Sequence, residues 1–312
     1  MSFLILIIGF FLLIKGADIF VEGAASIARR FNVPAMVIGL TIVAMGTSAP
    51  EAAVSITSSL AGQNDMSVAN VVGSNFFNIL MVLGVSSIIA TLPVQQSTIK
   101  KDAPFLLFVS GLLLLFSLDL KIGRIEGLIL LAVFVYFLID TVRTAKKSSF
   151  DESATTMDVD INENDSMIKT ILLSILGIVG IVIGGDIVVN SATDIATSFG
   201  MSANLVGLTI VAVGTSLPEF VTSIVAIKKG ETEIAIGNVI GSNIFNILLV
   251  LGLAAAISPI TISMFALIDI IFMVAITVLL FLFMKKNSSL VKSQGVILVA
   301  IYIAYMAYTI MR

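Results

Sequence analysis

Gly46-Thr47-Ser48-Ala49-Pro50-Glu51 returns 168 residues later as Gly214-Thr215-Ser216-Leu217-Pro218-Glu219. Twenty-two residues after each Glu comes a second shared element, first Gly73-Ser74-Asn75-Phe76-Phe77-Asn78 and then Gly241-Ser242-Asn243-Ile244-Phe245-Asn246. The same offset holds without a gap from Gly16 and Gly184 to Gly84 and Gly252. Each carboxylate lies in sequence apolar enough for a lipid bilayer, where an acidic group is costly. The chain is therefore a duplicated membrane protein with one polar motif in each half.

The composition is that of an integral membrane protein. Of the 312 residues, 58% are hydrophobic and 12% are charged, and the mean hydropathy is +1.13. A helix needs about 20 apolar residues to cross the hydrocarbon core. The first span is too long, and carries charges too early, for a cleaved signal peptide, so we expect it to be retained. We predict an all-α protein of the cell membrane with ten transmembrane helices, near 2–26, 34–60, 66–92, 103–119, 124–142, 168–193, 202–226, 232–257, 265–284 and 292–311.

Cysteine and histidine are both absent from the sequence. Disulfides, thiol redox centres and the usual zinc and haem sites are therefore excluded, as are a Ser-His-Asp triad and a histidine proton relay. We expect a protein that is not an enzyme, has no catalytic cofactor and has no nucleic-acid partner.

The basic residues predict the orientation. If the ten spans alternate in direction, only Lys121, Arg124 and Arg312 fall on one side, with Lys15 inside the first span. The positive-inside rule makes the richer side cytoplasmic, so both termini are expected outside the cell. That side carries Arg29, Arg30, Lys100, Lys101, Arg143, Lys146, Lys147, Lys169, Lys228, Lys229, Lys285, Lys286 and Lys292.

Five spans in each half predict an inverted repeat, because an odd number reverses the direction of the second half. Such repeats place the transported ion near the bilayer midplane and often build its site from broken helices. Pro50 and Pro218 cannot donate to the carbonyl four residues earlier, so we expect a break in each half. The domains are then residues 1–142, an acidic cytoplasmic linker over 143–167, and residues 168–312.

Helical spacing gathers the polar side chains of each motif. Residues three and four apart share a helix face, which groups Thr47 and Ser48 with Glu51, and Ser74 with Asn78. The second half repeats the group as Thr215, Ser216, Glu219, Ser242 and Asn246. The two groups offer two carboxylates, two amide oxygens and six hydroxyls. An all-oxygen set of this kind suits Ca²⁺ and Na⁺ and does not suit softer transition metals.

A purely structural role was weighed for each polar residue. Small polar side chains commonly join helices in membranes, so a single Ser, Thr or Asn proves little. A carboxylate at the bilayer centre costs about 2.5–3.5 kcal/mol on insertion scales, and this cost favours function for Glu51 and Glu219. For Lys15 and Asp18 we favour an internal ion pair over a role in transport. The role of Asp186 stays open, and Asp269 is expected near a helix end or bonded to a neighbouring helix.

Two further patterns favour ordinary structure over a ligand site. The Gly residues of the two Gly-Ser-Asn elements predict close helix contacts and local kinks. They do not predict a phosphate loop, because no Lys follows them. In the linker, the spacing of Asp158, Asp160 and Asn162 is that of an EF-hand start, but Glu163 and Lys169 stand where Gly and Glu are required.

The paired motifs resemble the two alpha repeats of the sodium/calcium exchangers, within the cation/calcium exchanger superfamily. This resemblance implies ten helices and a central ion cluster open to each side in turn. By matching positions it implies that the ligands are Thr47, Ser48, Glu51, Ser74, Asn78, Thr215, Ser216, Glu219, Ser242 and Asn246, with the carbonyls of Ala44 and Ala212. Some exchangers have an Asp where this chain has Asn78 or Asn246, so the cluster here carries two formal negative charges.

The expected activity is electrogenic antiport of several Na⁺ for one Ca²⁺. The alternative is an H⁺/Ca²⁺ antiporter that uses the same two Glu residues. A channel is disfavoured, because channels present rings of equivalent ligands. The sequence leaves open the stoichiometry, a role for K⁺ or H⁺, the divalent cation preferred, the physiological direction and the oligomeric state.

Deletion of residues 150–164 is expected to leave Na⁺-driven Ca²⁺ flux largely intact, because the linker has no counterpart in the repeats. Flux of the purified deletion variant in proteoliposomes, compared with the parent chain, is the measurement. A folded but inactive variant would show that the linker takes part in transport.

Overall fold

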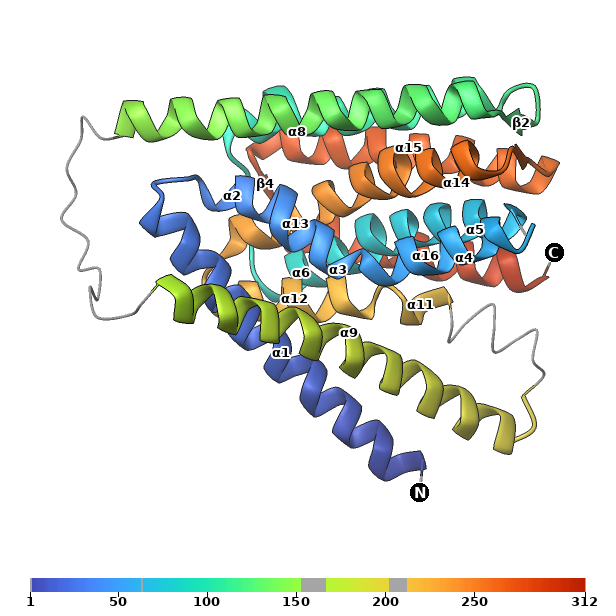
Figure 1. The fold of residues 1–312 in the computed structure, drawn as a ribbon, viewed down its shortest axis with the longest axis horizontal. Helices are drawn as coiled ribbons and strands as arrows, with labels where there is room; N and C mark the ends of the chain where they lie inside the picture. The colour runs from blue at the N-terminus through green and yellow to red at the C-terminus, as the bar shows by residue number, and fades with distance from the viewer. Residues whose placement is uncertain (1, 63, 153–166, 202–211, 312) are drawn as a thin grey trace.

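The long apolar runs of the sequence form helices in the computed structural model, which describes residues 2–62, 64–152, 167–201 and 212–311. Most of these helices run roughly along one direction, and α1 and α9 cross beneath the rest at an angle (Figure 1). The helices of the first half are α1 (Ser2–Arg30), α2 (Ala35–Ile38), α3 (Ala44–Thr47), α4 (Ala49–Leu60), α5 (Asn64–Phe76), α6 (Leu83–Ile89), α7 (Ala103–Ser117) and α8 (Arg124–Glu152). Those of the second half are α9 (Met167–Ser198), α11 (Ala212–Gly214), α12 (Leu217–Lys228), α13 (Thr232–Phe245), α14 (Gly252–Ile257), α15 (Met264–Asn287) and α16 (Lys292–Met311).

Short π-helical segments interrupt several of these helices. They are η1 (Gly39–Val43), η2 (Phe77–Val82), η3 (Thr98–Asp102) and η5 (Asn246–Leu251). The segments η2 and η5 begin at or just before Asn78 and Asn246, at nearly equivalent places in the two repeats. Such segments are rare and frequently occur at functional sites. They agree with the predicted kinks after the Gly-Ser-Asn elements.

Six described helices are long and apolar enough to cross a membrane. A seventh crossing results if the bent pair Ala35–Thr47 and Ala49–Leu60 forms one span. Of the remaining predicted spans, 103–119 contains α7, 292–311 contains α16, and 202–226 lies partly outside the described residues. The helical membrane fold is thus confirmed, while the count of ten stays a prediction. The six are Ser2–Arg30, Met66–Ile89, Arg124–Ala145, Met167–Ser198, Thr232–Ile257 and Met264–Asn287.

Two very short antiparallel ribbons join the halves. The strands are β1 (Leu92–Pro93), β2 (Lys121–Ile122), β3 (Ile260–Thr261) and β4 (Ser289–Leu290). Strand β1 pairs with β4 through Leu92 and Leu290, and β2 pairs with β3 through Ile122 and Ile260. The offset of 168 residues that relates the motifs also relates β1 to β3 and β2 to β4. Each ribbon therefore contains one strand from each half, and the two ribbons are equivalent.

Helices α1 and α9 pack along each other more extensively than any other pair, and they lie side by side in Figure 1. Equivalent glycines make this contact close. A Cβ atom on Gly16 would lie 2.7 Å from the amide nitrogen of Ile181, and one on Gly184 would lie 2.5 Å from that of Leu13. The backbones can approach this closely only because neither position has a side chain.

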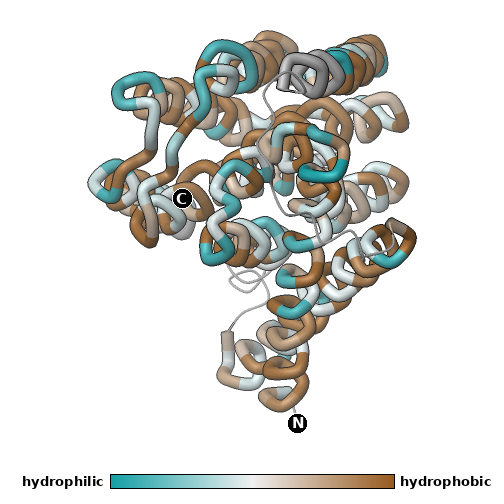
Figure 2. Tube along the Cα trace, turned by 90° about the vertical axis from the view of Figure 1, so that its left-hand side faces the viewer, coloured by the Kyte–Doolittle hydropathy of each residue, from teal (hydrophilic) through white to brown (hydrophobic). Residues whose placement is uncertain are grey.

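Both chain termini lie toward one end of the bundle, whereas α8 ends and α9 begins at the opposite end (Figure 1). We call these the terminus end and the linker end. Figure 2 looks at the linker end and shows hydrophilic turns among predominantly hydrophobic helices. This arrangement agrees with termini on one side of the membrane and a linker on the other.

Replacement of Gly184 by Ala is expected to lower thermal stability by about 1–3 kcal/mol, the usual cost of overpacking. The matched control is Gly111→Ala, because a Cβ there meets no heavy atom within 4 Å. The chain has no Trp, so loss of the monodisperse peak on size-exclusion chromatography after heating is a suitable measurement. Equal melting temperatures for the two variants would contradict the close contact of α1 and α9.

Candidate cation site

A break in each repeat positions the two conserved-type motifs at the centre of the bundle. Helix α3 ends at Thr47, Ser48 leaves helical geometry at φ −84° and ψ 8°, and α4 starts again with a bend of 48°. In the second half Ser216 has nearly the same geometry, φ −90° and ψ 4°, before α12. The prolines occupy the first turn of each new helix, where a missing N–H costs least. The predicted breaks are therefore confirmed.

The break places each Glu in the first turn of a helix. Glu51 lies in the first turn of α4, and Glu219 lies in the first turn of α12. Both side chains have no exposed surface. The unpaired amides and dipole at a helix N-terminus stabilise negative charge there.

The two repeats exchange hydrogen bonds at this point. The Ser48 hydroxyl donates to Glu219 Oε1 at 2.7 Å, and the Ser216 hydroxyl donates to Glu51 Oε1 at 3.1 Å. Each carboxylate is thus held by the serine at the break in the other repeat. The two broken helices meet in one polar cluster and do not form separate sites.

The Gly-Ser-Asn elements add a second serine to each carboxylate. Ser74 on α5 donates to Glu51 Oε1 at 3.2 Å, and Ser242 on α13 donates to Glu219 Oε1 at 3.4 Å. Ser74 also lies 3.0 Å from the Ser216 hydroxyl. All these hydrogen bonds reach one oxygen of each carboxylate.

The other carboxylate oxygens have no hydrogen-bond donor. Glu51 Oε2 and Glu219 Oε2 are buried without a partner, as are the amide oxygens of Asn78 and Asn246. Within the described part of the chain, no basic side chain pairs with either Glu, and no group of three or more His, Cys, Asp or Glu residues could hold a metal. The described cluster therefore presents four acceptor oxygens and two formal negative charges. Buried acceptors of this kind require a partner, and an ion is one.

The amide oxygens of Asn78 and Asn246 are left unpaired because their amide nitrogens are held from the opposite repeat. Asn78 Nδ2 donates to Asn243 Oδ1 at 3.2 Å, and Asn246 Nδ2 donates to Asn75 Oδ1 at 3.1 Å. Asn75 and Asn243 are residues of the quoted motifs to which the sequence alone assigned no role. They fix which way the site amides face.

Asn70 and Asn238 were also missed. Asn70 Nδ2 donates to the Glu51 carbonyl at 3.1 Å and to Ser55 at 3.0 Å. Asn238 Nδ2 bonds the Glu219 carbonyl at 3.4 Å and Ser223 at 3.1 Å in the same way. The signal for them was present in the sequence, because both pairs obey the offset of 168 residues.

The remaining predicted site residues lie at the breaks. The Thr47 hydroxyl lies 3.0 Å from Asn238 Oδ1, whereas the Thr215 hydroxyl is buried without a partner. The Ala44 carbonyl already accepts the Ser48 amide at 3.0 Å. The Ser216 amide donates to Val213 instead, at 3.2 Å, so the carbonyl of Ala212 is not occupied in the same way.

The predicted internal ion pair of Lys15 and Asp18 is wrong in its surroundings. The two groups lie 3.9 Å apart, but their side chains are 60% and 39% exposed on the outer side of α1. A shorter ion pair of 2.9 Å joins Asp18 to Lys229, which also contacts Glu22. These hydrogen bonds, chiefly the one to Asp18, raise the pKa of Lys229 above its ordinary value. Sequence spacing placed Lys15 beside Asp18 but could not reveal the contact with a distant turn.

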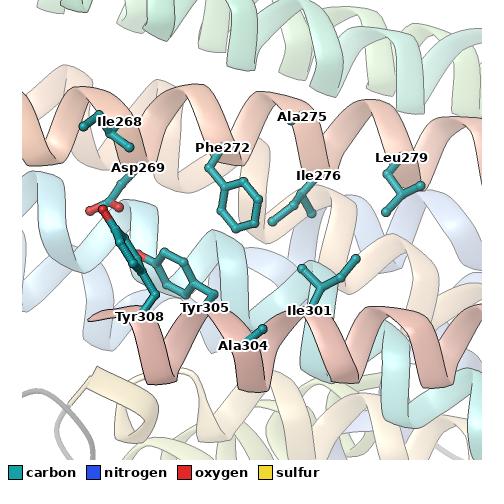
Figure 3. Close-up of a pocket in the computed structure, with 10 residues that line it drawn as sticks. All are labelled: Ile268, Asp269, Phe272, Ala275, Ile276, Leu279, Ile301, Ala304, Tyr305 and Tyr308. Atoms are coloured by element: carbon teal, nitrogen blue, oxygen red, sulfur yellow. The ribbon is translucent and has the colours of Figure 1, made fainter. Parts of the chain in front are cut away.

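Asp269 lies outside the cluster, near the start of α15 as expected. It points toward Tyr308 of α16, in a groove of about 540 Å³ that Phe272, Ile276 and Tyr305 also line (Figure 3). None of the twelve predicted site residues lines this groove.

The sequence and the fold both match known exchangers. The family model for the sodium/calcium exchanger protein matches residues 1–141 and 169–311. The chain is 32% identical to the sodium/calcium exchanger MaX1 of Methanosarcina acetivorans, with 98% of this chain and 97% of that protein covered. It is 44% identical to the putative antiporter CaxA of Alkalimonas amylolytica, over 81% of this chain and 80% of that protein.

A solved structure of the sodium-calcium exchanger NCX_Mj, obtained without Na⁺ and Ca²⁺, has the same fold. The TM-score is 0.87 at 32% sequence identity, and the match covers 99% of this chain and 98% of that structure. The family is one of transporters, which agrees with the expectation that the chain is not an enzyme. The chain belongs to the sodium/calcium exchanger family.

Proposed function

We propose that the chain exchanges Na⁺ for Ca²⁺ across the cell membrane by alternating access to one central site. The observation that carries this proposal is the set of four unpaired acceptor oxygens on Glu51, Glu219, Asn78 and Asn246. They face a cluster with two buried negative charges and no basic partner in the described chain. The names of the relatives, sodium/calcium exchanger and antiporter, support the same activity.

The oxygen inventory suits Ca²⁺. This ion takes six to eight oxygen ligands, preferably with some anionic charge. The four unpaired oxygens supply the core of that set, and the serine hydroxyls at the breaks supply the rest once their lone pairs turn toward the ion. Two carboxylates then leave a site with one bound Ca²⁺ electrically neutral.

Sodium ions suit the same oxygens, because Na⁺ is also a hard cation. Thr47 and Thr215, with the carbonyls of Ala44 and Ala212, extend the oxygen set on both sides of the carboxylates. Three Na⁺ at this cluster would leave a net charge of +1, so exchange for one Ca²⁺ moves charge across the membrane. The exchange is therefore electrogenic in this proposal.

Ion binding also joins the two repeats. Without a cation, Ser48 and Ser216 donate across the repeat boundary to Glu219 and Glu51. A cation between the carboxylates removes the repulsion between them and brings the broken helices under one shared charge. The empty site has two buried like charges, and this opposes crossing the membrane without an ion.

The domain organisation in this proposal is two inverted five-helix repeats, 1–142 and 168–312, joined by the linker 143–167. The exchange of strands between the two ribbons supports a two-fold relation between the halves. The location of both termini at one end supports an even number of crossings. We place the termini outside the cell and the linker in the cytoplasm, following the basic residues.

An outward Na⁺ gradient at fixed pH is expected to drive Ca²⁺ into proteoliposomes that contain the purified chain. A pH gradient without Na⁺ is expected to drive little uptake. The measurement is radioactive Ca²⁺ uptake under each gradient, with protein-free liposomes as the control. Uptake driven by the pH gradient alone would favour the H⁺/Ca²⁺ antiporter, which uses the same two carboxylates.

Glu51→Gln and Glu219→Gln are each expected to abolish Ca²⁺ uptake, because each removes half of the anionic charge that faces the ion. The matched control is Glu231→Gln, whose carboxylate lies outside the cluster in an ion pair with Arg29. Uptake and size-exclusion profiles are measured for all three. Near-normal uptake by either cluster variant would show that the ion binds elsewhere.

A further inference from the structure

The two repeats differ at one pair of equivalent contacts. Asn238 Oδ1 lies 3.0 Å from the Thr47 hydroxyl, and Asn238 Nδ2 donates to the Glu219 carbonyl at 3.4 Å. Asn238 thus connects a candidate ligand of the first repeat to the Glu of the second. The equivalent pair is Asn70 and Thr215. Asn70 Nδ2 bonds the Glu51 carbonyl in the same way, but the Thr215 hydroxyl is buried and has no partner.

Two equivalent glycines show the same difference independently. A Cβ atom on Gly241 of α13 would lie 2.5 Å from the Leu40 carbonyl oxygen and 2.8 Å from the Ala44 Cβ. A Cβ atom on the equivalent Gly73 of α5 would meet no heavy atom within 4 Å. The segment with Leu40 and Ala44 is therefore tightly packed on α13, whereas Gly73 faces open space.

These two contacts lie toward opposite ends of the bundle. Thr47 and Asn238 lie on the linker side of the carboxylates, beyond which a polar cavity of about 460 Å³ opens, lined by Met36, Leu40 and Glu233 among others. Asn70 and Gly73 lie on α5, which begins at the terminus end (Figure 1). The path to the carboxylates is therefore closed between η1, α3 and α13 at the linker side, and the matching contact at the other side is not made.

We propose that Asn238 and Asn70 are positioning residues that hold Thr47 and Thr215 in turn, one in each state of the transport cycle. In the state described here Thr47 is bonded to Asn238 and α3 is packed on Gly241. In the opposite state Thr215 bonds Asn70, α11 packs on Gly73, and α3 separates from Gly241. This inference rests on the alternating access proposed above, but it does not depend on which ions are exchanged.

The exchange of contacts is close to balanced in free energy. When Thr47 leaves Asn238, its hydroxyl keeps the Val43 carbonyl, 3.1 Å away, as an acceptor. In the same step the buried Thr215 hydroxyl gains an acceptor that it lacks here, and an unpaired buried hydroxyl is costly. A transporter requires such a balance, because a ligand can shift a population only between states of similar free energy.

The chain has no Cys, so a single introduced thiol can report which side is open. Met36→Cys is suitable, because Met36 is 3% exposed, lines the cavity at the linker side, and becomes accessible when α3 leaves α13. The experiment measures the rate of labelling by a membrane-impermeant maleimide, added at the linker side of proteoliposomes without Na⁺ or Ca²⁺. Matched substitutions in the two repeats are then added to this reporter.

Gly241→Ala is expected to raise the labelling rate about tenfold, because the added methyl clashes with Leu40 only in the state described here. Gly73→Ala is expected to lower it about tenfold, because the methyl fits the open space and blocks α11 only in the opposite state. The isosteric changes Thr47→Val and Thr215→Val are expected to act in the same opposite directions, by about threefold to tenfold, the usual worth of one hydrogen bond.

Gly73→Ala and Thr215→Val change no contact made in the present state, so both variants are expected to fold, and they decide the matter even if Gly241→Ala does not. Unchanged labelling in these two variants, or equal changes in the Thr47 and Thr215 variants, would overturn the proposal. The labelling needs no transported ion. A failure of Na⁺-driven uptake with the opposed labelling intact would therefore count against the exchange proposed above and not against the alternating contacts.

Discussion

Two carboxylates buried without a basic partner constrain the rest of this structure. Glu51 and Glu219 have no exposed surface, and in the described chain only serine hydroxyls donate to their side chains. A membrane interior does not tolerate such charges unless local dipoles, hydrogen bonds or a cation compensate them. The helix breaks supply the dipoles, the serines supply the hydrogen bonds, and the unpaired oxygens leave room for the cation.

Duplication explains how one short motif makes a complete site. Each break supplies a serine to the Glu of the other repeat, and each Gly-Ser-Asn element supplies an Asn whose amide nitrogen is held from the other side. Neither half holds its own carboxylate fully. The site therefore exists only where the halves meet, and relative movement of the halves changes it directly, which is what alternating access requires.

The sequence predicted the helical membrane fold, the break before each Pro and the gathering of Ser48, Glu51, Ser216 and Glu219, because short-range rules decide these features. It did not identify Asn70 or Asn238, whose roles depend on backbone carbonyls brought near by folding. It placed Lys15 and Asp18 inside the protein, since spacing alone gives no exposure. The difference between Thr47 and Thr215 cannot be read from a sequence in which the two repeats match.

The central claim is that a divalent cation lies between the two carboxylates. Anomalous diffraction from crystals soaked in Ca²⁺ or Sr²⁺ tests it most directly. The account predicts one strong peak within bonding distance, about 2.3–2.6 Å for Ca²⁺, of Glu51 Oε2 and Glu219 Oε2, with Asn78 or Asn246 completing the ligand set. A site without a peak at saturating Ca²⁺, or a peak bound only by residues outside this cluster, would contradict it.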